Sequence, residues 1–472
     1  MNEYNINYTD SWKEIFKTVP TGWFAFLLPA QILIYMIASS LSQWILLGLI
    51  PLILFIIALF RVKNTLVYTF LLFLPLLPIL PPTANTATGW ALFALLVVTW
   101  FFKWISRDFQ NQKMPGYVKI FFISFIIIGI FSTLNAFIIQ NSIAELIRYT
   151  SLAVLLFVLY QLIETKRELL IMLNIILIST CVMVILALPD IMAVSVKEVL
   201  SGAIIFQRLE SFYKNPNNFA IPFLLSIPII YSKIIFRQYK GIILNIILFG
   251  MLGFFLYVVF LTFSRSAYLC LFISMLFITL SLKIGRRIFL FFTTLFLIIL
   301  PFIAETLSTL IRLERGLTGR DILWKAAWQM IRNNFLLGVG PGNFESVKVY
   351  HILPMDFLSN IVRTEYVSGA AHNLYLTVFS EMGFLCLLSL VGFLILLFVK
   401  AWKGLKSATD NESRYLLYVA TSVLCGLVVR SFFESGVIIG SGRFGDTIFF
   451  LIPVLIIAKS DLLTAKNKKS LS

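Results

Sequence analysis

Two arginines and one histidine are the residues of this chain whose types and positions suggest chemistry. Arg320 and His372 lie near the edges of the one long polar stretch, residues 306–371, between hydrophobic segments. Arg265 lies in a short polar turn between two apolar runs. A guanidinium binds phosphate or carboxylate oxygens through paired hydrogen bonds, and a neutral imidazole accepts a proton near pH 7. These residues therefore suggest proton transfer beside a bound anion.

Five further polar side chains lie at the same predicted membrane surface and could approach the same cavity. They are Arg148, Arg208, Asn217, Ser264 and Arg430. A charge without a partner at this depth is strongly destabilising, so each arginine needs a ligand or an acidic neighbour. The simpler alternative is that Glu145 or Glu434 pairs with the arginines and that nothing binds. His351, in the middle of the polar stretch, is a weaker candidate for proton transfer than His372.

The composition is that of an integral membrane protein. Of the 472 residues, 60% are hydrophobic and 13% are charged, whereas soluble domains have about 25% charged residues. Apolar runs long enough to cross a hydrocarbon core of about 30 Å as helices recur along the whole chain. We expect an all-α polytopic protein of about 12–14 transmembrane helices. The fourteen expected spans are 21–39, 44–60, 66–80, 88–105, 117–137, 143–163, 168–188, 218–236, 242–262, 265–281, 286–305, 372–398, 414–432 and 446–459.

The basic residues predict the orientation. They concentrate in alternate loops and at both termini, which places those loops and both termini in the cytoplasm. The first span follows Lys13 and Lys17 without a small-residue cleavage site, so we expect an anchor rather than a signal peptide. The net charge of +16 follows from this topology and gives no argument for nucleic acid binding.

Arginine replaces lysine on the face predicted to lie outside. That face carries ten arginines and four lysines. Because a guanidinium is suited to phosphate or carboxylate, the bias suggests an anionic ligand on the outer face. Ordinary salt bridges in the loops are the alternative.

The large polar stretch divides the chain into three parts. Residues 1–305 form the N-terminal transmembrane helices, 306–371 an extracytoplasmic loop, and 372–472 the C-terminal helices and cytoplasmic tail. Within the loop, residues 320–334 predict a helix, because Ile322, Ala326 and Met330 recur at helical spacing. The glycines of Gly338-Val339-Gly340-Pro341-Gly342-Asn343 predict a turn that ends this helix. We favour such a turn over a phosphate-binding loop, because no Lys-Ser/Thr follows it.

Metal ions and other cofactors are not expected. The cysteines Cys181, Cys270, Cys386 and Cys425 all fall within predicted spans and lack the spacing of a zinc site or a disulfide framework. No paired aspartates of the kind that hold a metal with a nucleotide sugar occur on either face.

Several motifs, in order and spacing, resemble the signature of the O-antigen ligase and polymerase superfamily. They are Ser264-Arg265-Ser266, Gly319-Arg320 with Trp324, Gly338-Val339-Gly340-Pro341-Gly342-Asn343-Phe344, and His372-Asn373-Leu374-Tyr375-Leu376 with Glu381 and Gly383. The signature covers roughly residues 205–385, and the flanking spans match only as hydrophobic segments. Many members have about twelve spans, which is fewer than the fourteen expected here.

The resemblance implies a helical membrane glycosyltransferase of the GT-C type in the bacterial cytoplasmic (inner) membrane. Its implied donor is an undecaprenyl-diphosphate-linked glycan, used outside the membrane without a metal. Arg265 and Arg320 are then expected to clamp the diphosphate, with Arg208, Asn217 and Arg148 in support. His372 is expected to deprotonate the acceptor hydroxyl, with inversion at the anomeric carbon.

The acceptor stays open at this point. A second lipid-linked glycan would make the enzyme a polymerase of O-antigen, exopolysaccharide or wall polymer, whereas a lipid or protein acceptor would make it a ligase. Membrane lipids, a flippase and a chain-length regulator are further partners that the resemblance implies. The alternative from another class is a polysaccharide transporter or flippase. It would show related halves or broken helices at the midplane, and the sequence has no internal repeat.

Overall fold

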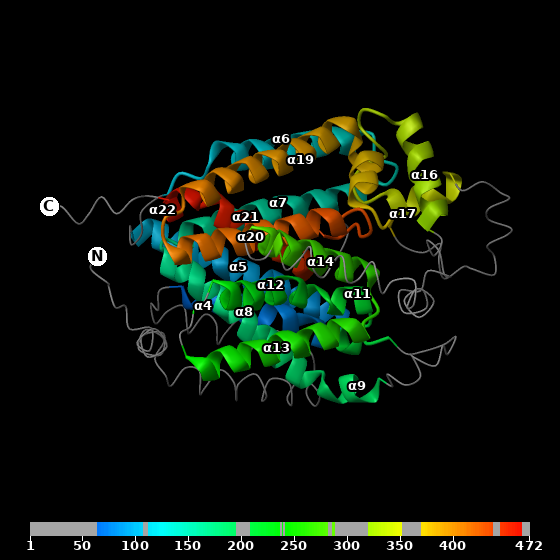
Figure 1. Ribbon diagram of the computed structural model, residues 1–472. Coiled ribbons are helices and arrows are strands. Elements are labelled where there is room, and N and C mark those ends of the chain that lie inside the picture. Colours follow the sequence, from blue (N-terminus) through cyan, green and yellow to red (C-terminus); the bar gives the residue numbers. More distant parts are fainter. Residues whose placement is uncertain are drawn as a thin grey trace.

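The computed structural model shows an all-helical bundle with one separate helical element at its end (Figure 1). It describes residues 64–106, 112–194, 208–236, 238, 241–281, 286–287, 320–351, 370–437 and 444–464. Helix α16 (Arg320–Asn333) lies beyond one end of the bundle, across the direction of the long helices. We call this end of the bundle the α16 end.

Eight helices in the described residues are long and apolar enough to cross a membrane. Seven of them are α5 (Pro82–Ser106), α6 (Gly116–Leu134), α7 (Ile139–Leu162), α8 (Lys166–Leu186), α13 (Ile242–Leu261), α19 (Leu374–Ser407) and α20 (Asn411–Arg430). The eighth is formed by α11 (Pro216–Phe219) and α12 (Ile221–Ile235) together. Shorter apolar helices are α4 (Thr65–Phe73) with the 3₁₀ helix η1 (Leu74–Ile79), α14 (Arg265–Leu280), and α21 (Phe444–Ala458).

The apolar runs form helices because a helix satisfies its own backbone hydrogen bonds, which lipid cannot do. Eleven of the fourteen expected spans coincide with these helices. The expected spans 21–39 and 44–60 lie outside the described residues, as does 286–305 apart from residues 286 and 287. The expectation of an all-α polytopic membrane protein is confirmed. The remaining short elements are α9 (Leu188–Ala193), η2 (Ser211–Tyr213), α17 (Phe344–Val347), η4 (Lys348–His351) and α22 (Ser460–Thr464).

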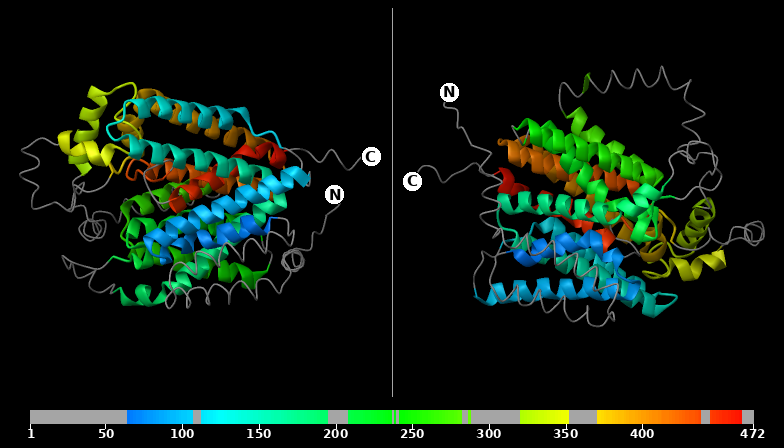
Figure 2. Two further views of the ribbon diagram at one scale, coloured as in Figure 1. Left: turned by 180° about the vertical axis from the view of Figure 1, so that it is seen from behind. Right: turned by 90° about the horizontal axis from the view of Figure 1, so that it is seen from below.

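The helices pack around α12, which is the most buried of the spans. It contacts α8, α13, α14 and α20, and α14 packs along α20. Helices α6 and α19 lie side by side as an outer layer, and α13 lies on the opposite side of the bundle (Figures 1 and 2). Exposed Ile243, Ile246 and Phe249 on α13 suit contact with lipid. All four cysteines are free and lie in helices, and Cys270 and Cys386 are buried.

The two ends of the bundle differ in charge. The connections α5–α6, α7–α8, α12–α13 and α19–α20 lie at the end away from α16, where Lys103, Lys166, Lys233 and Lys400 lie. Lys166 pairs there with Asp410 at 2.9 Å and with Glu412 at 3.1 Å. The α16 end carries the α6–α7 and α13–α14 connections, the start of α19 and the end of α20. These connections bring the candidate site residues together.

Candidate functional site

The turn between α13 and α14 positions Arg265 as the first residue of α14. Phe263 has a φ of 47°, a left-handed conformation that is uncommon for a residue with a side chain. Ser264 donates its backbone N–H to the Thr262 hydroxyl at 3.3 Å, and its own hydroxyl lies 3.4 Å from that of Ser266. Strained conformations of this kind concentrate at functional sites. The turn therefore directs Arg265 and the two serines to the α16 end of the bundle.

Arg208 supports this turn from the preceding segment. Its Nε donates to the Thr262 carbonyl at 2.9 Å, and its Nη2 donates to the Phe263 carbonyl at 3.3 Å. The same Nη2 lies 3.2 Å from the side-chain oxygen of Asn217, at the start of α11. Arg208 therefore joins the α13–α14 turn to Asn217, and much of its hydrogen-bonding capacity is used within the protein.

A single carboxylate, that of Glu434, joins five segments of the α16 end. It follows α20 and accepts hydrogen bonds from Asn217 at 2.9 Å, Ser266 at 3.3 Å and Arg320 at 3.4 Å, all at Oε1. Its other oxygen, Oε2, lies 3.4 Å from Nδ1 of His372. The Glu434 side chain is 14% exposed, and that of Arg320 is 18% exposed. Residues far apart in the sequence thus form one polar cluster, which we call the Glu434 cluster.

The cluster keeps Glu434 ionised. Burial alone would raise the pKa of this carboxyl, but the hydrogen bond with His372 and the positive charges of Arg430 and Arg320 hold the pKa below its ordinary value. The positive charges of Arg265 and Arg320 also act on each other. Among the described residues, the guanidinium groups of Arg265, Arg320 and Arg430 thus lie around the carboxylate of Glu434, and guanidinium groups suit an anionic ligand.

His372 faces the cluster because the start of α19 is fixed on both sides. Its φ is 48°, again in the left-handed region. Asn373 caps α19 by accepting the backbone N–H of Leu376 at 3.0 Å, and Leu374 donates its backbone N–H to the Ser431 carbonyl at 2.8 Å. The helix cap is therefore Asn373, so capping does not account for His372. The imidazole is 37% exposed and can reach a substrate.

Helix α16 carries Arg320 at its start. The helix predicted over residues 320–334 is confirmed, since α16 spans Arg320–Asn333. Its apolar stripe is buried as the spacing predicts, at Ile322, Leu323, Ala326, Ala327, Met330 and Ile331. This stripe packs within the protein, against α19 and η4, while Trp328 stays 48% exposed. Trp324 donates its indole N–H to the carbonyl of Ala371 at 2.9 Å. The helix is thereby attached one residue before His372.

The glycine-rich turn after α16 binds a carboxylate of the protein itself. Glu381 on α19 accepts the backbone N–H groups of Gly342 at 3.0 Å and Phe344 at 2.9 Å. Gly340 has a φ of 95° and donates its N–H to the Glu381 carbonyl at 2.8 Å. Two amides that could have bound phosphate are therefore occupied by Glu381. The interpretation of this segment as a helix-ending turn agrees with the geometry, and the turn fixes α16 on α19.

The structure separates Arg148 from the Glu434 cluster. Arg148 forms an ion pair with Glu145 on α7, as expected if an acidic neighbour rather than a ligand balances its charge. Its charge also acts on Glu381 of α19. His351 lies in η4, outside the cluster. The other candidate site residues lie in or beside the cluster: Arg208, Asn217, Ser264, Arg265, Arg320, His372 and Arg430. Among the described residues, no group of three or more His, Cys, Asp or Glu side chains is arranged to hold a metal ion.

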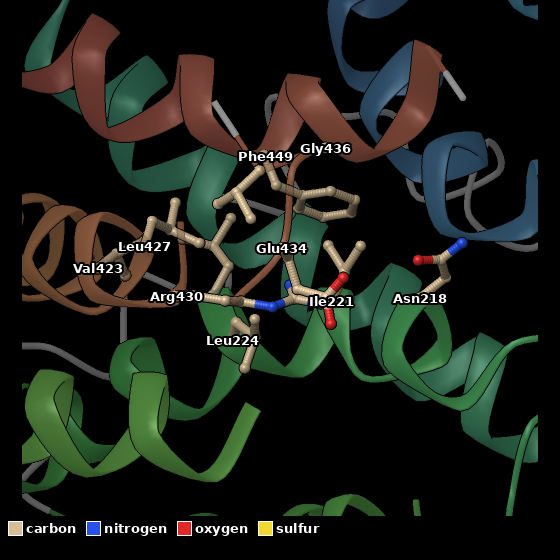
Figure 3. A pocket seen from close by; sticks show the side chains of 11 residues that line it. Asn218, Ile221, Leu224, Val423, Leu427, Arg430, Glu434, Gly436 and Phe449 are labelled. Atoms are coloured by element: carbon tan, nitrogen blue, oxygen red, sulfur yellow. The ribbon is translucent and has the colours of Figure 1, made fainter. Parts of the chain in front are cut away.

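A pocket opens beside the cluster between α12, α20 and α21 (Figure 3). Most of its lining residues are apolar, and Asn218, Arg430 and Glu434 are the polar ones. Arg430 is 2% exposed and donates Nη2 to the Asn217 carbonyl at 2.8 Å. Its buried Nε has no hydrogen-bond partner among the described residues. Arg430 therefore lies buried beside the cluster and is held there by Asn217.

The central place of Glu434 was not predicted as a functional role from the sequence, where this residue appears only as a possible partner of an arginine. Glu381 likewise appears there only as part of a motif. One signal was available for Glu434: an acidic residue four positions after Arg430, directly beyond an apolar span, needs a buried partner. The identity of its other partners depends on contacts between distant segments, which a single sequence does not reveal.

Comparisons with known proteins bear on the middle of the chain. Residues 249–391 match a family model described as O-antigen ligase. This segment contains Arg265, Arg320 and His372, whereas Asn217, Arg430 and Glu434 lie outside it. No curated protein matches the chain. The match confirms the resemblance to the O-antigen ligase and polymerase superfamily and, with the bundle of apolar helices, indicates a membrane protein that processes glycans.

Proposed function

We propose that this protein is a membrane glycosyltransferase that moves a glycan from undecaprenyl diphosphate to an acceptor hydroxyl. The observation that carries the proposal is the convergence of Arg265, Arg320 and His372 on one cluster at one end of the bundle. These three residues come from three different segments, and all three lie within the part that matches the O-antigen ligase family. Guanidiniums beside an imidazole suit the departure of a diphosphate together with deprotonation of a nucleophile.

The proposed reaction is a single displacement. Nε2 of His372 takes the proton of the acceptor hydroxyl as that oxygen bonds to the anomeric carbon of the donor sugar. The bond between this carbon and the phosphate oxygen breaks, and its electron pair leaves with the lipid diphosphate. Arg265 and Arg320 stabilise the negative charge that grows on the leaving group, which preorganised donors in a water-poor site can do without a metal. Attack opposite the leaving group inverts the anomeric configuration.

The remaining polar residues have supporting roles in this proposal. Arg208 and Asn217 hold the α13–α14 turn and the Glu434 carboxylate in place. Arg430 and Ser264 support the cluster from within the protein, since they are 2% and 1% exposed. Arg148 is assigned to the support of α7, because it pairs with Glu145.

The orientation proposed for the protein places the α16 end outside the bacterial cytoplasmic membrane. Lysines at the opposite end support this, because basic loops are retained in the cytoplasm. Both termini then lie in the cytoplasm. The acceptor is a second lipid-linked glycan in a polymerase, or a lipid or protein hydroxyl in a ligase.

The test is glycan transfer by the purified protein in lipid vesicles. The chain has two histidines, so His351→Ala is a matched control for His372→Ala. We expect His372→Ala to lower transfer by about 10²- to 10⁴-fold, to a residual rate, and His351→Ala to retain it, with both proteins inserted in the membrane. A His372→Ala protein with wild-type activity would remove this residue as the base. Movement of the lipid-linked glycan across the vesicle without any change in its size would favour a transporter.

Arg265→Lys tests the diphosphate clamp separately. Lysine keeps the charge but offers no planar fork of donors. We expect transfer to fall by about 10²- to 10³-fold, comparable to the loss of one donor to a developing oxyanion. Retained activity would mean that a positive charge suffices at this position. Longer chains without an added acceptor would indicate a polymerase, and a new conjugate with lipid or protein would indicate a ligase.

A further inference from the structure

The two oxygens of the Glu434 carboxylate have different neighbours. Asn217, Ser266 and Arg320 all approach Oε1, at 2.9, 3.3 and 3.4 Å. Oε2 faces Nδ1 of His372 at 3.4 Å. Three donors on one oxygen fix the plane of the carboxylate and leave the other oxygen for the imidazole. This is the arrangement of an orienting group, since an ion pair with Arg320 alone would not determine which oxygen meets His372.

The backbone sets the separation between Glu434 and His372. Glu434 donates its backbone N–H to the Arg430 carbonyl at 3.0 Å, which continues the last turn of α20. Within that turn, the Ser431 carbonyl accepts the N–H of Leu374 at 2.8 Å. The turn that carries the carboxylate and the turn that carries the imidazole are thus joined by a main-chain hydrogen bond. The left-handed φ of 48° at His372 is a further constraint, and such strain persists only where the surroundings impose it.

We propose that Glu434 is a positioning residue for His372: its Oε2 accepts the Nδ1 proton and leaves Nε2 without a proton, directed toward the acceptor hydroxyl. The two ring nitrogens of histidine are distinct, and the hydrogen bond at one determines the role of the other. Glu434 remains an acceptor throughout, and the proton from the acceptor hydroxyl stays on His372. The carboxylate also stabilises the imidazolium that forms in the displacement. This inference rests on the proposed function.

Glu434 additionally connects His372, the proposed base, to Arg320, one of the two arginines proposed to bind the diphosphate. Arg320 and His372 contact the same carboxylate through different oxygens. Glu434 therefore fixes the imidazole relative to the guanidinium, and so relative to the leaving group. Misplacement of a reacting group by about 1 Å can lower a rate by about 10²-fold. Glu434 lies outside the segment that matches the family model, so the match does not assign it a role.

Glu434→Gln tests the inference because it keeps the size of the side chain. Asn217 and Arg320 donate toward Oε1, so the amide oxygen of Gln is expected at that position and its NH₂ group then faces His372. Nδ1 must then accept, which moves the ring proton to Nε2. We expect turnover of the lipid-linked glycan to fall by about 10²- to 10⁴-fold, with the affinity for the donor within about threefold of wild type. Glu145→Gln is the matched control, since Glu145 is a buried acid that pairs with an arginine but does not contact His372.

A double-variant cycle separates positioning from general support of the fold. If Glu434 acts through His372, adding Glu434→Gln to His372→Ala will lower the residual transfer by less than about twofold. A further loss as large as in the wild-type background would overturn the inference, as would wild-type turnover in Glu434→Gln or an equal loss in Glu145→Gln. Failure of the proposed function itself looks different: the wild-type protein then transfers no glycan in the same assay.

Discussion

Gly383 on α19 occupies a conformation that a side chain would disrupt, and Gly383→Ala should therefore displace α16. Its φ is 79° and its ψ is −178°, a combination that is essentially restricted to glycine. A Cβ atom there would lie 2.0 Å from the carbonyl oxygen of Leu336 and 2.6 Å from the backbone nitrogen of Leu337. Since an ordinary carbon–oxygen contact is about 3.3 Å, the backbone must shift by more than about 1 Å.

The displaced segment directly follows α16. The carbonyl of Phe335, which precedes Leu336, accepts the backbone N–H of Phe384 at 2.9 Å, so the segment that follows α16 is attached to α19 at this point. Arg320 is the first residue of α16, so we expect a shift at the other end of this helix to move Arg320 relative to Glu434. We expect a loss of about 2 to 5 kcal/mol of stability from backbone strain and overpacking. Transfer is expected to fall by about 10²-fold through misplacement of Arg320.

Gly392→Ala on the same helix is the matched control. A Cβ at Gly392 meets no atom within 4 Å, and alanine favours a helix over glycine. The assay is the thermal unfolding midpoint in detergent, followed by glycan transfer in vesicles for both variants. We expect a lower midpoint and weaker transfer for Gly383→Ala only. Wild-type values for Gly383→Ala would refute the claim that this contact positions α16.

Two further predictions concern buried carboxylates at the α16 end. Glu381→Gln should lower stability by about 2 to 4 kcal/mol, because the amide has one oxygen and cannot accept both the Gly342 and the Phe344 N–H groups. The control is Glu345→Gln, at an exposed position of the same segment, which should leave stability unchanged. The measurement is the unfolding midpoint of each variant, and equal midpoints would contradict the prediction. Because the native pKa of Glu434 is held below its ordinary value, its carboxylate adds stability above the unfolded pKa of about 4.5, and this contribution is lost as the pH falls through the lower native pKa. The advantage in unfolding midpoint of wild type over Glu434→Gln should therefore be constant above about pH 5.5 and shrink as the pH falls below about 4.5. A difference independent of pH would contradict an ionised Glu434.

Much of the fold follows from the sequence because lipid imposes a simple constraint. Each run of apolar residues must form a helix to satisfy its backbone, so spans such as α8 and α13 can be located from hydropathy alone. Helix α16 was equally predictable, since Ile322, Ala326 and Met330 mark one buried face. The predicted ends of some helices differ from those in the structure: α19 continues to Ser407, whereas its expected span ends at 398.

The candidate site could be predicted only in part. Arg265, Arg320 and His372 are recognisable because polar residues at the ends of apolar spans need a reason to be there. The place of Arg148 was harder to predict, because pairing with Glu145 three residues earlier competes with any shared cavity. The contacts of Glu434 with Asn217 and His372 join residues that are 217 and 62 positions apart. Contacts of this kind arise from how the helices pack, which no local pattern in one sequence encodes.

The most direct test of the account is an experimental structure of the His372→Ala protein in lipid nanodiscs with an undecaprenyl-diphosphate-linked glycan bound. This variant lacks the proposed base and should retain the donor. We expect the diphosphate to lie within hydrogen-bonding distance of Arg265 and Arg320, with the anomeric carbon beside the space left by the imidazole. A diphosphate bound at the opposite, lysine-rich end of the bundle, or away from both arginines, would contradict the account.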